Sequence, residues 1–368
     1  MPRPSPRPPP GDRPGRPQPA SPAPPTAPPP GSETTMTEPR PAEPAAPRSS
    51  DAADTACPDV LACEYASPRI AAIWSPRTQV VLERRLWLTV LRAQHAEGLR
   101  VPDQVFRDYA RAVDRVDLAS IRRREHATRH DLKARIEEFN ALAGHQHIHK
   151  GLTSCDITDN IAQTRVRMSL RHLRGRAAAL ARAAGAETRG AASGAVLGSA
   201  AAALDALLER YPLRGLKGPV GTAQDMLDLL GGDRAALARI EERVAAHLGF
   251  PRVLRSVGQL YFRSLDYEVL SSLSEFAARA GSLVPAAPGE GRDTRGPVRS
   301  FAVLLRGYTA MAAQLAGEQW NEGDVSCSVV RRIALPGACY AADATLNTVE
   351  RALGFPRQLG VPRQAVRG

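Results

Sequence analysis

The chain has 368 residues, a formal net charge of +11 and five cysteines, none of them in a Cys-x-x-Cys pair. Such scattered cysteines exclude a disulfide framework and a cysteine-based zinc site, and they suit a reducing compartment, so we expect a cytoplasmic protein. The positive charge is spread over the tail and helical stretches with 5% aromatic residues and no recognition motif, which favours a solvated surface over a nucleic-acid interface.

Residues 1–56 are rich in proline and arginine and poor in large apolar residues. Such a segment cannot bury enough apolar surface to offset the entropy of ordering it, so we predict a disordered tail with polyproline II character. It lacks the apolar stretch of a secretory signal peptide. An alanine-rich run within residues 185–212 is too weakly hydrophobic to span a bilayer, so no membrane partner is expected.

From about Ala66 onward the apolar residues recur at helical spacing. Ser75 followed by Pro76 predicts a helix start, because serine caps the first free N–H groups and proline tolerates the first helical position. Gly98 predicts the end of this helix, because glycine readily adopts the left-handed conformation that terminates helices.

Two further helices follow along the chain. Thr128 with Asp131 three residues later resembles a capping box, and it predicts a helix that ends near Gly144. The next helix is predicted to begin at Thr153 and to continue to about Ala184.

The remainder of the chain is also predicted to be helical. Glycine is expected to interrupt the first half of the alanine-rich run, and no convincing strand or repeat is present. We therefore predict an all-α fold in which long helices pack into a bundle. The later segments are predicted as helices at 233–248, 264–280, 301–319 and 331–353, with a loop at 284–300. The predicted domains are a helical domain at 57–150, a bundle at 151–353 and a tail at 354–368.

Three polar clusters lie at predicted helix boundaries. Backbone N–H groups at a helix start, with the hydroxyls of Thr153 and Ser154 beside them, form a natural anion site. Two adjacent arginines near serine hydroxyls suit a phosphate or a carboxylate. Singly, each cluster is better explained by capping or by a charged surface; their joint occurrence indicates an active site. The clusters are Arg129-His130-Asp131, His149 to Asp156, and Asp324 to Arg332.

Two other motifs carry no functional prediction. His145, His147 and His149 alternate, but no Cys, Asp or Glu stands at ligand spacing in that short span, so we expect no metal. The segment GLKGPVGT lacks the Gly-Lys-Ser/Thr order of a phosphate loop, and no cofactor is predicted.

Several long runs resemble adenylosuccinate lyases of the fumarase/aspartase superfamily. WSPRTQVVLERRLWLTVLRAQHAEGL, TRHDLKARIEEFNALAG and IHKGLTSCDITDN are similar to the N-terminal half of these enzymes. GLKGPVGTAQDMLDLLGGD, SVGQLYFRSLDYEVL and LAGEQWNEGDVSCSVVRRIALP resemble their central helical domain. The resemblance extends, with gaps, from about Leu61 to Ala352.

This resemblance implies an all-helical homotetramer, each active site of which draws residues from three chains. It implies a β-elimination that releases fumarate from adenylosuccinate, or from the succinylated carboxamide nucleotide, in purine biosynthesis. Thr153 and Ser154 would hold a succinyl carboxylate, and Ser328 and Arg332 the nucleotide; His130 and His149 match active-site histidines. The implied substrate-binding residues are Tyr65, Arg129, His130, Asp131, Thr153, Ser154, Gln259, Ser328 and Arg332.

The chain departs from the family pattern where the chemistry is expected. The family's acid/base histidine has no counterpart, because no histidine lies between His172 and His247. The catalytic serine loop is replaced by residues 284–300, which contain neither Ser-Ser nor Lys, and Glu64 stands where the family has arginine. The family's C-terminal helical domain has no counterpart after Ala352.

These departures leave three interpretations open. The chain is a lyase of low intrinsic activity, because loss of an acid/base group typically costs roughly 10²–10⁴-fold in rate. Alternatively, it is a non-catalytic relative that binds nucleotide or assembles with an intact lyase. The third interpretation is a degraded gene product without a stable role.

Overall fold

The computed structural model describes residues 59–186, 190–285, 295–319 and 326–355. The predicted tail at 1–56, residues 286–294 of the predicted loop and most of the predicted 354–368 tail lie outside these ranges. The boundary near residue 150 stays a prediction.

The predicted all-α fold is confirmed within the described ranges. They contain one π-helix and twelve α-helices, and the only strand-like pairing among them is an isolated bridge between Leu213 and Val253. In chain order the elements are η1 (Leu61–Tyr65), α2 (Pro68–Trp74), α3 (Pro76–Ala96), α4 (Asp103–Ala112), α5 (Leu118–Thr128), α6 (Asp131–Ala143), α7 (Ser154–Gly185), α8 (Ala191–Arg210), α9 (Gln224–Leu229), α10 (Arg234–Leu248), α11 (Ser264–Gly281), α12 (Arg295–Leu315) and α13 (Ser326–Ala352).

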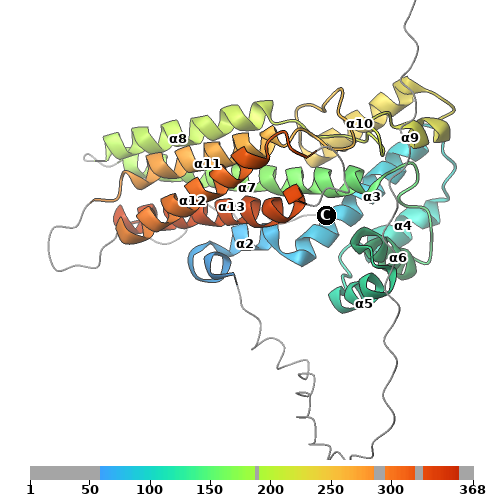
Figure 1. The fold of residues 1–368 in the computed structure, drawn as a ribbon, viewed down its shortest axis with the longest axis horizontal. Helices are drawn as coiled ribbons and strands as arrows, with labels where there is room; N and C mark the ends of the chain where they lie inside the picture. Colours follow the sequence, from blue (N-terminus) through green and yellow to red (C-terminus); the bar gives the residue numbers. More distant parts are fainter. Residues whose placement is uncertain (1–58, 187–189, 286–294, 320–325, 356–368) are drawn as a thin grey trace, which may run out of the picture. The chain divides into compact units, whose positions relative to one another are not determined.

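Five long helices form the bundle. Figure 1 shows α7, α8, α11, α12 and α13 running side by side, with α3–α6, α9 and α10 grouped toward one end. α7 packs against α8 and α13, and α11 contacts α8, α12 and α13. Leu170 and Leu173 of α7 and Leu197 and Leu204 of α8 have no exposed surface. Burying each such side chain contributes roughly 1.5–3 kcal/mol, which is what holds these helices together.

α8 corrects two expectations. It is helical from Ala191, although glycine was expected to interrupt the alanine-rich run. The reason is packing: a Cβ at Gly194 would lie 2.9 Å from the carbonyl oxygen of Ala181, so glycine permits close approach of α8 to α7. By length and composition α8 is also apolar enough to cross a membrane, a property that core helices of soluble bundles share.

Helix ends follow the local signals, with one correction. Ser75 caps α3, its hydroxyl accepting from the Thr78 N–H at 3.2 Å. The cap of α6 is His130 rather than Thr128, and its Nδ1 accepts from the Lys133 N–H at 3.3 Å. Thr128 cannot serve, because it is the last residue of α5.

The predicted starts of the last two helices were late. α12 begins at Arg295, inside the predicted loop, and α13 begins at Ser326 rather than near residue 331. α13 also continues through Pro336, where a helix interior loses one backbone hydrogen bond.

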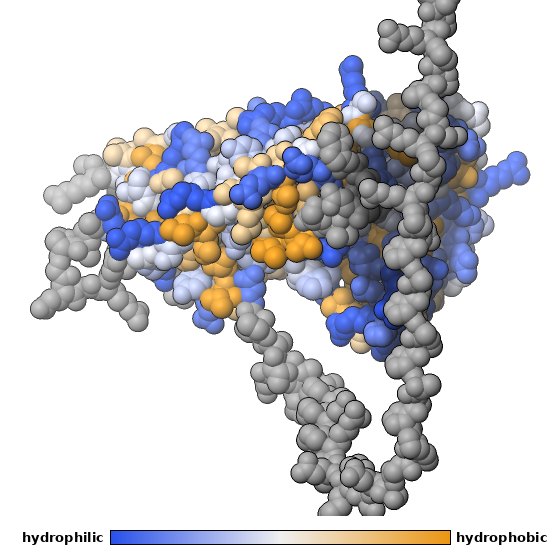
Figure 2. Space-filling view, viewed as in Figure 1, coloured by the Kyte–Doolittle hydropathy of each residue, from blue (hydrophilic) through white to orange (hydrophobic). Residues whose placement is uncertain are grey.

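Apolar side chains remain on the surface of the last two helices. Figure 2 shows hydrophobic residues in the region where α12 and α13 lie. Val303 and Met311 of α12 are 60% and 44% exposed, and Val329 and Ile333 of α13 are 58% and 56% exposed.

Candidate active site

A cleft of about 770 Å³ opens where the start of α7, the start of α6 and the first turns of α13 meet. Among the residues that line it are five that the sequence singled out: His130, Asp131, Ser154, Ser328 and Arg332. They come from three segments far apart in the chain, so the fold brings together much of the set that the resemblance implied.

The start of α7 is held by a buried carboxylate. Asp156 has no exposed surface; it accepts hydrogen bonds from the N–H groups of Thr153 at 2.9 Å and Lys217 at 2.8 Å. It also forms a buried ion pair with Arg214 at 2.5 Å. These contacts fasten the glycine-rich connection to the helix start, so that Ser154 faces the cleft in a fixed position.

A second ion-pair chain supports the start of α6. Arg135 lies between Glu83, at 2.7 Å, and Asp131, at 3.1 Å. Burial raises the pKa of Asp131, but the Arg135 guanidinium outweighs this effect and holds the pKa below its ordinary value. Asp131 is therefore a carboxylate at neutral pH, and Arg332 reaches it at 3.9 Å across the cleft.

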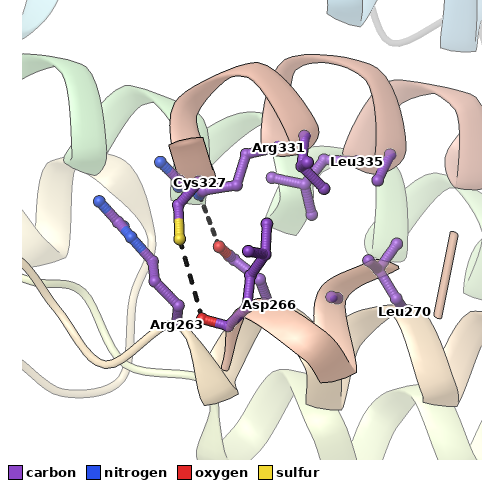
Figure 3. A pocket seen from close by; sticks show the side chains of 10 residues that line it. Arg263, Asp266, Leu270, Cys327, Arg331 and Leu335 are labelled. Atoms are coloured by element: carbon purple, nitrogen blue, oxygen red, sulfur yellow. Dashed lines mark hydrogen bonds and ion pairs between the residues drawn. The ribbon is translucent and has the colours of Figure 1, made fainter. Parts of the chain in front are cut away.

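The two adjacent arginines of α13 have different roles. Arg332 is 78% exposed at the cleft, whereas Arg331 turns inward and donates to Asp266 at 2.6 Å and Asp159 at 3.3 Å. Consecutive helical residues point about 100° apart, so one can pair inside while its neighbour faces solvent. Figure 3 shows Arg331 reaching Asp266 in a small pocket lined also by Cys327. The predicted paired guanidinium is thus one exposed cation, Arg332, beside a structural one, Arg331.

Three implied residues lie outside the cleft. Tyr65 is 44% exposed in a separate groove, where its ring packs edge-on against Phe301 at 5.3 Å. Arg129 ends α5 at φ 55° with its side chain exposed. Gln259 does not line the cleft; its backbone carbonyl accepts from Arg214 at 2.6 Å.

His149 and Thr153 also lie behind the cleft wall. His149 adopts φ 66°, and its Nδ1 accepts from the Trp87 indole N–H at 3.1 Å. Burial lowers the pKa of His149 to about 4, so the ring is neutral at pH 7 and carries its proton on Nε2. Thr153 caps α7 directly before Ser154. Within the described ranges no three side chains of His, Cys, Asp or Glu come together as a metal site.

Sequence reasoning missed several charged residues that line the cleft, among them Asp159, Arg165 and Arg263. Arg165 donates to the carbonyl of Ile73 at 3.1 Å and its guanidinium stacks over Trp74 at 4.5 Å, so it closes the end of α2. A signal was present for Asp159, because it is a charged residue on the same face of α7 as the buried Val166 and Leu170.

The cleft is better equipped to bind an anion than to move a proton. His130 is the only histidine that lines it among the described residues. Its Nδ1 accepts from Lys133, so the neutral ring presents Nε2–H as a donor rather than a base. Burial raises the pKa of Tyr340, at the edge of the cleft, to about 12, so its hydroxyl also stays protonated.

Comparison with known proteins identifies the family. No family model matches the chain. The adenylosuccinate lyase of Saccharomyces cerevisiae is 31% identical over 344 residues, which cover 78% of this chain and 71% of that enzyme. The chain belongs to the adenylosuccinate lyase family. The Schistosoma mansoni adenylosuccinate lyase is 27% identical over 342 residues, covering 79% of this chain and 71% of its own length.

Solved structures show the fold of this adenylosuccinate lyase relative independently. A fumarate lyase from Mesorhizobium sp. BNC1 aligns with a TM-score of 0.62 at 18% identity, over 78% of this chain and 75% of that one. A 3-carboxy-cis,cis-muconate lactonizing enzyme from Pseudomonas putida gives 0.64 at 16% identity, over 80% and 76%. The predicted superfamily fold is confirmed.

Proposed function

We propose that the cleft binds adenylosuccinate, or the succinylated carboxamide ribonucleotide, and that the chain catalyses the β-elimination releasing fumarate at a low intrinsic rate. The observation that carries the proposal is the convergence of Ser154, His130, Ser328 and Arg332 on one cleft. Hydroxyls, a helix start and an unburied guanidinium suit a ligand with carboxylates and a phosphate. We expect this reaction to take place in the cytoplasm.

The reaction demands a proton acceptor and fixed donors. A base removes a proton from the carbon beside a succinyl carboxylate, the C–N bond breaks, and the departing nitrogen is protonated. The negative charge that builds on the carboxylate requires fixed hydrogen-bond donors, which Ser154 and the first N–H groups of α7 would supply. Ser328 and Arg332 would hold the phosphate.

Binding without turnover is the second candidate. It is favoured by the absence of a histidine between His172 and His247. It is also favoured by the hydrogen bond that His130 Nδ1 already accepts from the Lys133 N–H. In this case the chain acts as a nucleotide-binding relative, alone or assembled with an intact lyase. The exposed apolar side chains of α12 and α13 support assembly with further copies or with such a lyase.

Fumarate release and nucleotide binding separate the two candidates. We expect the purified chain to bind AMP in calorimetry and to release fumarate at least about 100-fold more slowly than the yeast enzyme, since it lacks the acid/base group. Arg332→Ala should abolish AMP binding, whereas Arg182→Ala, an exposed arginine of α7 outside the cleft, should not. Absence of AMP binding by the wild type would refute the proposal.

Co-expression tests the assembly. A full-length lyase that carries Ala at its own Arg-His-Asp histidine should regain fumarate release when this chain supplies His130. Co-purification without activity would leave a binding role. A monomeric chain that does not co-purify would exclude mixed assembly.

A further inference from the structure

The buried carboxylate of Asp159 has one oxygen engaged and one without a hydrogen-bond partner. Asp159 lies in the second turn of α7, is 3% exposed and lines the cleft. Its Oδ1 accepts from Arg263 Nη1 at 3.2 Å and from Arg331 Nη1 at 3.3 Å. Its Oδ2 has no hydrogen-bond partner within the part of the chain that the structure describes.

We propose that Asp159 Oδ2 accepts a hydrogen bond from a neutral donor of the bound nucleotide and so selects ligands that carry that donor. A buried carboxylate oxygen without a partner is unfavourable, because it has lost water and gained nothing in exchange. A ligand hydroxyl or N–H placed there restores the missing bond. The inference rests on the proposed nucleotide site.

The charge balance of the cluster determines what kind of donor fits. Two guanidinium groups, Arg263 and Arg331, face two carboxylates, Asp159 and Asp266. Asp266 has both oxygens engaged, one with Arg331 and the other with the hydroxyl of Tyr261 at 2.6 Å. The cluster is neutral overall, so it neither requires a cation nor attracts a second anion, and a neutral hydroxyl or N–H matches it.

The position of the cluster relates Oδ2 to the nucleotide. Arg331 holds Asp159, and the next residue, Arg332, is the exposed cation to which we assign the phosphate. A nucleoside monophosphate offers two kinds of neutral donor beyond its phosphate: the ribose hydroxyls and the exocyclic N–H of the base. Both share the chemistry that Oδ2 requires, and ligand analogues distinguish them.

The test is a matrix of ligands and variants measured by calorimetry on the full chain. The ligands are AMP and three analogues that each lack one donor group of AMP: 2′-deoxy-AMP, 3′-deoxy-AMP and purine riboside 5′-monophosphate, which has no exocyclic amino group. We expect one of the three analogues to bind the wild type about tenfold more weakly than AMP. In Asp159→Asn the amide oxygen keeps the bonds to Arg263 and Arg331, because both guanidiniums require an acceptor. The NH₂ group then faces the ligand and cannot accept a hydrogen bond from it, so this variant should bind AMP and that analogue equally.

Asp266→Asn is the matched control. It removes the same charge from the same cluster, but neither Asp266 oxygen is open, so the preference for AMP should remain. Equal binding of all four ligands to the wild type overturns the inference while leaving the proposed function intact. Retained preference in Asp159→Asn overturns it also. Failure of AMP to bind at all overturns the proposed function itself. If Asp159→Asn does not fold, the wild-type series decides alone.

Discussion

Asp156→Asn should destabilise the protein strongly. Asp156 and Arg214 are both without exposed surface, and the carboxylate also accepts from the backbone of Thr153, Lys217 and Gly218. An amide of the same shape keeps the volume but removes the charge that balances Arg214. The change thus isolates electrostatics from packing.

The size of the effect follows from the burial. Removing one partner of a buried ion pair costs about 3–5 kcal/mol, because the other charge stays buried and uncompensated. For a folded unit of roughly 300 residues the unfolding entropy is about 0.6 kcal/mol/K, so a loss of about 4 kcal/mol lowers Tm by about 6 °C. Arg214→Met should cost less, since Asp156 would keep its three backbone donors.

Differential scanning calorimetry measures the effect. Asp225→Asn, at an exposed position in the first turn of α9, is the control and should move Tm by less than about 1 °C. A Tm for Asp156→Asn equal to that of this control would refute the reasoning. AMP affinity should fall in parallel, because Asp156 anchors the helix start that presents Ser154.

Three further predictions concern single sites. Burial lowers the pKa of His149 to about 4, so the neutral ring stabilises the fold above pH 6.5 and that contribution is lost as the pH falls toward 4. His149→Gln should therefore show a flatter dependence of stability on pH in urea titrations. An NMR titration of His149 with a midpoint near 6.5 would contradict this. Gly221→Ala should lower Tm more than Gly232→Ala, since both glycines have φ 86° but only at Gly221 would a Cβ lie 2.1 Å from a carbonyl oxygen; equal losses would disprove the clash. Arg331→Met should lower Tm by several degrees, whereas Arg332→Ala should leave Tm unchanged and remove AMP binding; the reverse pattern would show that the two roles are misassigned.

The sequence by itself determined most of the long helices and the family. Helices begin or end where the sequence predicted at Ser75, Gly98, Gly144 and Thr153. These positions could be predicted because helix capping and helix termination depend on hydrogen bonds within a few residues. The apolar periodicity likewise predicted which faces are buried. Where local signals competed, as at Thr128 and His130, the prediction was wrong by two residues, because the preceding helix used Thr128 first.

Only the tertiary structure decided how the site is composed. The sequence predicted that the two adjacent arginines bind an anion together. In the structure, Arg331 pairs with Asp159, 172 positions away, while Arg332 faces the cleft. Tyr65 matches the family motif but lies in another groove. Such outcomes depend on the packing of α7, α11 and α13, which brings residues distant in sequence into contact. No short-range sequence pattern encodes those contacts.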